Sequence, residues 1–274
     1  MKITVLCDNN TYIDQYYLGE PAFSCLIEDG EKTILLDVGY SDVFLKNAEA
    51  LGIDLSPVTD IVLSHGHNDH TGGLGAFLAA FPQPINLWAH PDVFLPKEKD
   101  GLSIGSPLSL EELPQRVSLH LQAQPGAVSP HVLFLGQIPR HHSFEGIRPI
   151  GQVLKNGQWI PDLLPDDTGL ALSCRDGIFL LSGCAHSGIA NMTKACRSLF
   201  PEREIIGILG GFHLFEVDEI SLQTIEALKA LGVQRIYPCH CTALPVKAAL
   251  MEHFTVTEVA VSFSMEEWDG HPFQ

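Results

Sequence analysis

Positive charge is scarce in this sequence. Its 274 residues include 16 lysines and arginines against 33 aspartates and glutamates, a formal net charge of −17 at pH 7. Nucleic acids and anionic membranes are bound through clustered lysine and arginine side chains. We therefore expect neither nucleic acid nor a membrane as a partner. A few basic groups can still hold a small anionic substrate. The composition does not exclude a homo-oligomer.

Long apolar runs are also missing. No stretch approaches the roughly 18 apolar residues that a membrane-spanning helix needs, and residues 1–6 turn polar too soon for a signal peptide. The cysteines are odd in number, and most lie inside apolar runs, as expected of buried free thiols in a reducing cytosol. We expect a cytoplasmic protein. The cysteines are Cys7, Cys25, Cys174, Cys184, Cys196, Cys239 and Cys241.

No linker or low-complexity tract divides the chain, and 45% of its residues are hydrophobic. We therefore expect one α/β (α+β) domain over residues 1–274. Repeated prolines interrupt the pattern between about residues 91 and 165. We interpret that region as an insertion of strands and loops that lies over the functional face and shapes substrate choice, with residues 132–138 as its clearest strand.

The rest of the chain alternates between strands and helices. Twice it follows one plan of strand, Asp-Gly turn, strand, polar loop and helix, which predicts a sandwich of two related halves. The predicted strands are residues 2–7, 22–28, 32–37, 61–63, 85–89, 169–174, 177–181, 204–209, 235–238 and 255–263. The predicted helices begin near residues 41, 74, 189 and 219 and end near residues 52, 81, 199 and 231.

Metal-capable side chains are concentrated directly after the strand at 61–63. His65 and His67 alternate, so in an extended backbone both point the same way and can clamp one cation. Asp69 and His70 follow where the chain turns, and can face a second cation. Imidazole and carboxylate ligands suit zinc, iron or manganese. A polar loop with chance histidines would not be expected to concentrate four such side chains within six positions.

Two later histidines, His186 and His240, also fall just past strand ends. They complete a predicted set of six ligands for two divalent ions: His65, His67 and His186 for one, with Asp69, His70 and His240 for the other. Two such ions can share a hydroxide and polarise a phosphoryl or carbonyl oxygen. The residues therefore predict a metal-dependent hydrolase with a metal-bound hydroxide as nucleophile, two ions that are most simply zinc, and Asp69 as both ligand and proton acceptor.

The segment Ser64-His65-Gly66-His67-Asn68-Asp69-His70-Thr71-Gly72-Gly73 resembles the His-x-His-x-Asp-His signature of the metallo-β-lactamase superfamily. The resemblance implies an αββα four-layer sandwich with a metal site at one edge of its two sheets. An aspartate at the position of Asp37 would then buttress the metal loop, although a simple turn residue at a strand end is the alternative.

Further segments resemble one subgroup of that superfamily, the dihydropterin–ribofuranosylaminobenzene phosphate synthases. They are residues 44–48, 182–189, 210–214 and 238–242. The likeness implies a second reaction, a transferase that joins a dihydropterin methyl group to a ribofuranosylaminobenzene phosphate. The subgroup has a His after the Glu that corresponds to Glu20, where this chain has Pro21; Thr242-Ala243 replaces a common Thr-Gly. A metal-occupied metabolite sensor is a third, non-enzymatic hypothesis.

The resemblance leaves the ligand near residue 184 open. Cys184 occupies the position where the superfamily has an Asp or Cys ligand, and Asp166 or Asp167 that of a histidine ligand, which leaves His186 two residues beyond. Cys184 and His186 can both face the metals only if the backbone turns at Gly183 or Ala185. We favour His186 as the ligand, Cys184 as a packed neighbour and Asp167 as an outer or bridging contact.

The remaining candidates concern the substrate. Arg140 could hold a phosphate or carboxylate through its bidentate fork, and His141 and His142 could approach the metals; a solvated loop is the alternative for all three. His213 could donate a hydrogen bond or a proton to the substrate, or pack in the core. We add Glu20 as a candidate substrate contact, and expect Cys239 and Cys241 to pack rather than to bind zinc.

Overall fold

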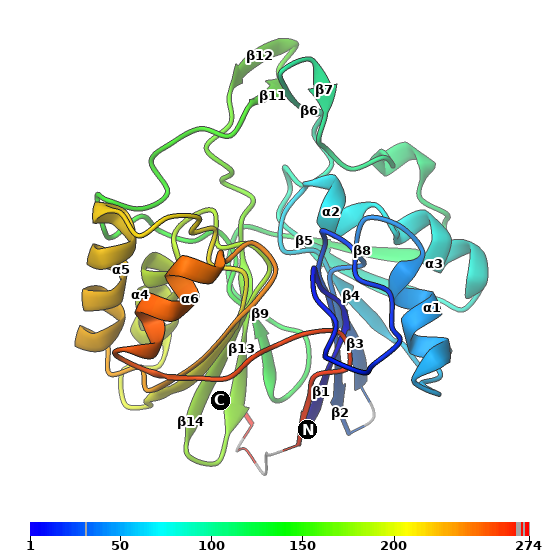
Figure 1. The fold of residues 1–274 in the computed structure, drawn as a ribbon. Coiled ribbons are helices and arrows are strands. Elements are labelled where there is room, and N and C mark those ends of the chain that lie inside the picture. Colours follow the sequence, from blue (N-terminus) through cyan, green and yellow to red (C-terminus); the bar gives the residue numbers. More distant parts are fainter. Residues whose placement is uncertain (31, 267–269, 271, 274) are drawn as a thin grey trace.

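The protein consists of four layers, with two large sheets face to face and helices on their outer sides (Figure 1). The computed structural model describes residues 1–30, 32–266, 270 and 272–273. This architecture confirms the predicted αββα sandwich. Both chain ends lie at the lower end of the sheets in Figure 1, opposite the end at which the loops after β4 and β14 emerge.

The first sheet has seven strands in the order β18-β1-β2-β3-β4-β5-β8. Neighbours from β18 to β3 are antiparallel, and neighbours from β3 to β8 are parallel. Its strands are β1 (Lys2–Cys7), β2 (Ser24–Asp29), β3 (Lys32–Leu36), β4 (Asp60–Val62), β5 (Ile85–Ala89), β8 (Val117–Leu121) and β18 (Ser264–Glu266).

The second sheet repeats this plan in the order β17-β16-β15-β14-β13-β10-β9. It is antiparallel from β9 to β14 and parallel from β14 to β17. The two predicted Asp-Gly hairpins, β2–β3 and β13–β14, therefore occupy matching places in the two sheets. Its strands are β9 (Gly126–Ala127), β10 (Val132–Phe134), β13 (Gly169–Cys174), β14 (Gly177–Ser182), β15 (Ile205–Gly210), β16 (Arg235–Pro238) and β17 (Thr255–Val256).

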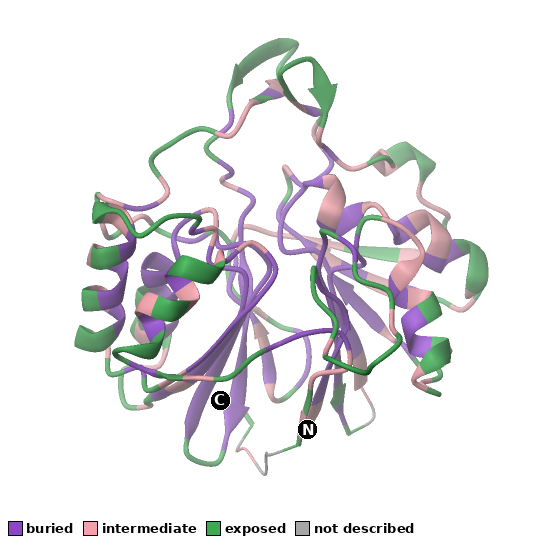
Figure 2. Ribbon diagram, viewed as in Figure 1, coloured by how far each residue is buried: buried purple, intermediate pink, exposed green. Residues whose placement is uncertain are grey.

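Helices cover the outer face of each sheet, because strands with two apolar faces must be buried on both sides (Figure 2). In β2, Ile27 faces the opposite sheet whereas Leu26 faces the helices. The helices over the first sheet are α1 (Val43–Ala50), α2 (Asn68–Thr71) and α3 (Leu74–Ala80). Those over the second are α4 (Ile189–Leu199), α5 (Glu219–Ala230) and α6 (Leu244–Met251), and a short 3-10 helix spans Leu110–Glu112.

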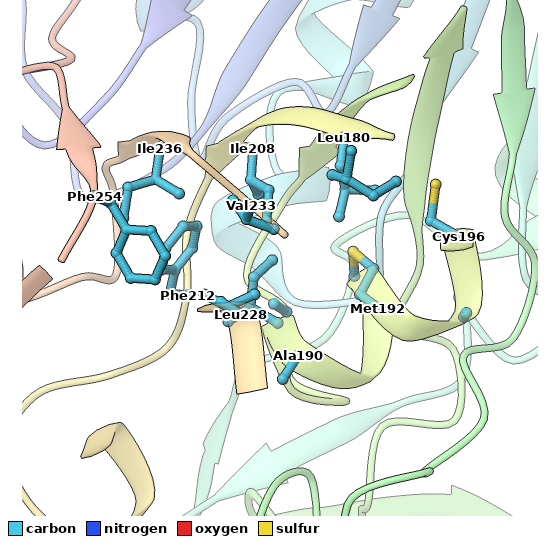
Figure 3. Close-up of a cluster of buried hydrophobic side chains, with 14 of the residues drawn as sticks. Leu180, Ala190, Met192, Cys196, Ile208, Phe212, Leu228, Val233, Ile236 and Phe254 are labelled. Carbon is cyan, nitrogen blue, oxygen red and sulfur yellow. The ribbon is translucent and has the colours of Figure 1, made fainter. Parts of the chain in front are cut away.

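The layer between the second sheet and its helices is drawn in Figure 3. Met192 of α4 and Leu228 of α5 pack with Leu180 and Ile208 from the strands. Phe212, which follows β15, belongs to the same cluster. Its burial fixes the loop that carries the next residue, His213, which is half-buried.

The structure divides the proline-marked region that we interpreted as one insertion. Strand β8 belongs to the first sheet, and β9 and β10 belong to the second. Only a third sheet and its loops project, above the loops after β4 and β14 in Figure 1. Its strands are β6 (Lys97–Lys99), β7 (Leu102–Ser103), β11 (Gln152–Lys155) and β12 (Gln158–Pro161), in the order β12-β11-β6-β7.

Two predicted strands are too long. The strand expected over 132–138 ends at Phe134, and the chain then turns through Gly136 at a φ of +70°. The strand expected over 255–263 is limited to β17, and α6 before it was not anticipated. A proline in the first turn of α6 is a helix-start signal that identifies it in retrospect. Within the described residues, no helix combines the length and apolar character needed to cross a membrane.

Candidate metal centre

Three loops bring the predicted ligands together at one edge of the two sheets, and a fourth brings His213 beside them. The ligand loops follow β4, β14 and β16 and the His213 loop follows β15, and the carboxyl ends of these strands point the same way within each parallel part (Figure 1). Loops anchored on buried strands can hold side chains from distant parts of the sequence at one point. The ligand-capable side chains form two neighbouring groups there.

The first group consists of His65, His67 and His186, all buried and each with one ligand atom within 4.8 Å of the others. The Nε2 atoms of His65 and His186 are 3.1 Å apart. The Nε2 atom of His67 is buried and has no hydrogen-bond partner among the described residues. Buried ring nitrogens are normally hydrogen-bonded, so three that converge without other partners fit a cation between them.

The second group consists of Asp69, His70, Cys184 and His240. The Nε2 atom of His70 is 3.1 Å from the Cys184 sulfur and 3.2 Å from Nε2 of His240. The Asp69 carboxylate lies 3.4 Å from His240 Nε2 and 3.6 Å from His70 Nε2. Nitrogen, oxygen and sulfur donors in one tetrad suit zinc, whereas manganese prefers sites richer in oxygen.

Hydrogen bonds to Nδ1 fix the ring orientation of three histidines. Asp37 lies 2.6 Å from Nδ1 of His70, and the Asn9 side-chain oxygen lies 3.0 Å from Nδ1 of His240. The Ser64 hydroxyl donates to Asp37 and lies 3.0 Å from Nδ1 of His65. Each oxygen accepts from Nδ1–H, so the Nε2 lone pair of each ring is left for a metal. Asp37 thus has the supporting position that the resemblance implied.

Burial and neighbouring charge set the protonation of the ligands. Burial lowers the pKa of His67 to about 3 and that of His65 and His186 well below the ordinary value. These rings are therefore neutral near pH 7, as metal binding requires. At His70, Asp69 and Asp37 outweigh burial and raise the pKa. Burial opposes ionisation of Asp69, but His70 and His240 together hold its pKa below the usual range.

Cys184 and His186 do not compete for one position. Ala185 between them has a φ of +53°, and this turn of the backbone lets both side chains face the site. His186 joins the first group, as we favoured, but Cys184 lies within the second group rather than beside it. Burial and a hydrogen bond to Cys241 raise the pKa of the Cys184 thiol in the protein without a metal.

Asp167 belongs to neither group. One of its oxygens accepts hydrogen bonds from the backbone and hydroxyl of Ser187, and the other is buried without a partner among the described residues. Burial raises its pKa to about 6. The carboxylate therefore supports the loop that carries His186, and the outer or bridging contact that we expected stays a prediction.

Both groups open into one cleft of about 990 Å³. Its lining includes His213, whose ring centroid is 4.4 Å from that of His186 and whose pKa is lowered to about 4, chiefly by burial. Its only lysines are Lys99 and Lys247, and among the described residues neither has an ion-pair partner. His213 and Phe215 also line a neighbouring cavity of about 380 Å³.

The basic loop predicted to contact substrate is placed elsewhere. The Arg140 guanidinium donates to backbone oxygens of four residues, namely Ile138, Gly146, Leu163 and Leu164, and so staples two loops together. His141 is exposed, and His142 packs against Phe144. None of the three lines the cleft. The expectation is corrected because backbone carbonyl oxygens accept from all three guanidinium nitrogens, away from the cleft.

The expectation that Glu20 contacts the substrate is also corrected, because its carboxylate is already hydrogen-bonded within the protein. Its carboxylate accepts from the backbone N–H groups of Tyr40 and Ser41 and from the Ser41 hydroxyl. The side chain is therefore turned inward to hold the loop before α1. Its neighbour Pro21, however, does line the cleft. The position at which the resemblance implies a histidine is thus part of the cleft lining.

Sequence reasoning missed several supports of the centre. Asp8 accepts from the backbone N–H of His240, next to the contact from Asn9. These two residues end the first strand, and that position beside a strand end was the only signal. A buried lysine, Lys97, was also missed because it lies in the proline-marked region, where no pattern predicted burial.

The family model of the metallo-β-lactamase superfamily matches residues 18–240. The chain is 32% identical over 269 residues to the 7,8-dihydropterin-6-methyl-4-(β-D-ribofuranosyl)-aminobenzene-5′-phosphate synthase of Methanocaldococcus jannaschii, covering 93% of this chain and 92% of that one.

Solved structures agree in fold. Tm1679, described as a metal-dependent hydrolase of the β-lactamase superfamily, superposes with a TM-score of 0.86 at 28% identity over 98% of this chain and 100% of that one. A diphosphatase of the PhnP family shares the fold alone, with a TM-score of 0.60 at 13% identity over 99% of both chains. Signature loop, four-layer sandwich and matched family model agree, and the chain belongs to the metallo-β-lactamase superfamily.

Proposed function

We propose that the protein is a hydrolase that binds two divalent metal ions, with zinc as the first choice, and cleaves a small ester or phosphate-bearing substrate. The observation that carries the proposal is the pair of ligand groups, side by side and open to one cleft. Ions bound there would polarise a carbonyl or phosphoryl oxygen and make water a nucleophile near neutral pH.

The chain's own residues divide the remaining work. His65, His67 and His186 would hold one ion, and Asp69, His70, Cys184 and His240 the other. The Asp69 carboxylate is ionised and reaches the cleft, so it can also accept a proton. Neutral His213 lines the cleft beside His186 and can hydrogen-bond to the substrate.

The cleft also supports an anionic substrate. Lys99 extends from β6 of the projecting sheet and Lys247 from the first turn of α6 over the second sheet, so the two reach the cleft from different parts of the fold. A lysine with no carboxylate partner is available to a phosphate or carboxylate group. In a chain with a net charge of −17, two lysines on one cleft without an ion-pair partner among the described residues favour a small anion over a neutral substrate.

A transferase is the second candidate. It is supported by the 32% identity to the methanogen synthase over most of both chains. Against it stands Pro21, which lines the cleft where that subgroup has a histidine. Proline offers no hydrogen-bond donor, so any substrate contact made by that histidine is absent here.

The test is an activity panel on protein reconstituted with zinc, manganese or iron. We expect turnover of an activated phosphodiester, phosphomonoester or thioester that rises with pH to a plateau near neutrality and disappears on chelation. Asp69→Asn should lose at least about a hundredfold in kcat, whereas His120→Gln, on β8 outside the cleft, should not change it.

Two other outcomes would overturn the hydrolase. If a dihydropterin diphosphate reacts with ribofuranosylaminobenzene phosphate while every hydrolytic substrate is inert, the transferase is correct. If neither assay shows turnover but a metabolite binds tightly to the metal-loaded protein, the protein is a sensor.

A further inference from the structure

A lysine is buried beneath the metal loop. Lys97 is the first residue of β6 in the projecting sheet, and only 1% of its surface is exposed. Its Nζ atom lies 2.7 Å from Asp162 and 3.0 Å from Asp166, both fully buried. A buried ammonium group is costly unless it is paired, so a fold retains one here only with such partners close by.

Asp166 connects this charge to the metal centre. Its second oxygen accepts a 2.8 Å hydrogen bond from the backbone N–H of Gly66, the residue between the ligands His65 and His67. The second oxygen of Asp162 accepts from the backbone N–H of Leu164 and so fixes the backbone that leads to Asp166. The chain of contacts thus runs from an ammonium group through a carboxylate to the backbone of the metal loop.

The loop has little freedom at this point. A Cβ atom on Gly66 would lie 2.2 Å from the Val93 carbonyl oxygen and 2.8 Å from Cε of Lys97. On the other side, the N–H of Asn68 donates to Ile104, whose own N–H donates to the Lys97 carbonyl. Lys97 is therefore linked to both sides of the loop, through Asp166 on one side and through Ile104 on the other.

We propose that Lys97 is a positioning residue that, through Asp166, holds the loop of His65 and His67 in the geometry that binds the first metal ion. Without the ammonium group, Asp162 and Asp166 repel each other, and Asp166 withdraws from the Gly66 N–H. The rings of His65 and His67, which this backbone positions, then no longer converge on one point. The second group depends on Asp37, Asn9 and Asp8 instead, so its affinity should change little.

This inference rests on the proposed metal binding, and the test separates the two. Zinc is titrated into metal-free protein against a chromophoric chelator, and the two binding steps are assigned with His186→Ala and His240→Ala. In Lys97→Met we expect the first-group Kd to weaken about 10- to 100-fold and the second-group Kd to change less than about threefold. Asp166→Asn should act in the same direction.

Lys32→Met is the matched control. Lys32 Nζ lies 2.7 Å from Asp60, which is also fully buried but begins β4, at the far end of that strand from the metal loop. Each variant leaves a buried carboxylate without the lysine that pairs with it. An effect on structure alone would therefore appear in both variants. Only the Lys97 variant should change metal affinity.

If Lys97→Met does not fold, Asp166→Asn keeps the Lys97–Asp162 pair and should show the same selective weakening. Lys97→Met combined with Asp162→Asn removes the repulsion and should recover first-group affinity. Equal loss at both metal groups, or unchanged affinities in all variants, would overturn the inference while the wild-type protein still binds two ions. A wild-type protein that takes up no metal would overturn the proposed function together with it.

Discussion

At the scale of single residues, the centre depends on which ring nitrogen each histidine presents. Asp37, Asn9 and Ser64 each occupy the Nδ1 side of a different histidine, so the Nε2 atoms of His70, His240 and His65 converge. Such supporting partners commonly change metal affinity 10- to 100-fold when removed. The histidines could be predicted from their spacing and Asp37 from the family resemblance. The contacts of Ser64 and Asn9 could not, because they depend on how the folded loops meet.

Cys184 and His186 give a prediction at this scale. His186→Ala removes one of three ligands from the first group and should cost one metal equivalent and nearly all activity. Cys184→Ser leaves Asp69, His70 and His240 in place, so both equivalents should remain, with weaker zinc binding because a thiolate favours zinc. Elemental analysis after gel filtration measures both. Loss of metal from Cys184→Ser with full retention by His186→Ala would show that the two roles are exchanged.

At the scale of elements, the loops at the strand ends support one another by direct contact. Gly183, after β14, lies so close to the loop after β4 that a Cβ atom would meet the Ser64 hydroxyl at 2.1 Å and the Asp37 carboxylate at 2.7 Å. The two halves of the sandwich thus meet at the residues that orient the ligands.

Gly183→Ala should therefore disturb both folding and metal binding. We expect a loss of about 1–3 kcal/mol in the free energy of unfolding, with weaker metal uptake because Ser64 and Asp37 must shift. Gly75→Ala in α3 is the control: its Cβ would meet only Leu108, at 3.7 Å, and alanine favours helix by up to about 1 kcal/mol. Urea denaturation with and without zinc tests the pair. A Gly183→Ala protein as stable and as metal-competent as wild type would contradict the close packing of these loops.

Elements with a strong hydrophobic period could be predicted almost to the residue. Strands β1 and β13 and helix α4 have the expected bounds. The failures lie where burial is decided by distant contacts. Arg140 had the character of an anion-binding side chain, but its guanidinium donates to carbonyl oxygens that folding brings close. Nothing in the sequence predicted the burial of Lys97, which two aspartates more than 60 residues away stabilise.

At the scale of the whole molecule, two matching half-sandwiches each contribute ligands to both groups. The first half supplies His65, His67, Asp69 and His70, and the second supplies Cys184, His186 and His240. Bound cations would also offset part of the charge of −17. The signature loop and strand-end histidines revealed this plan in the sequence, whereas the membership of Cys184 in the second group needed the folded chain.

The central claim is that the two groups each hold one metal ion, and the most direct test is metal stoichiometry. The protein is stripped with chelator, reconstituted separately with zinc, manganese and iron, freed of excess ion and analysed for elemental content per chain. We predict close to two equivalents of at least one metal, falling to about one in either His186→Ala or His240→Ala. Less than a tenth of an equivalent for every metal would contradict the account, as would a single equivalent that survives both substitutions.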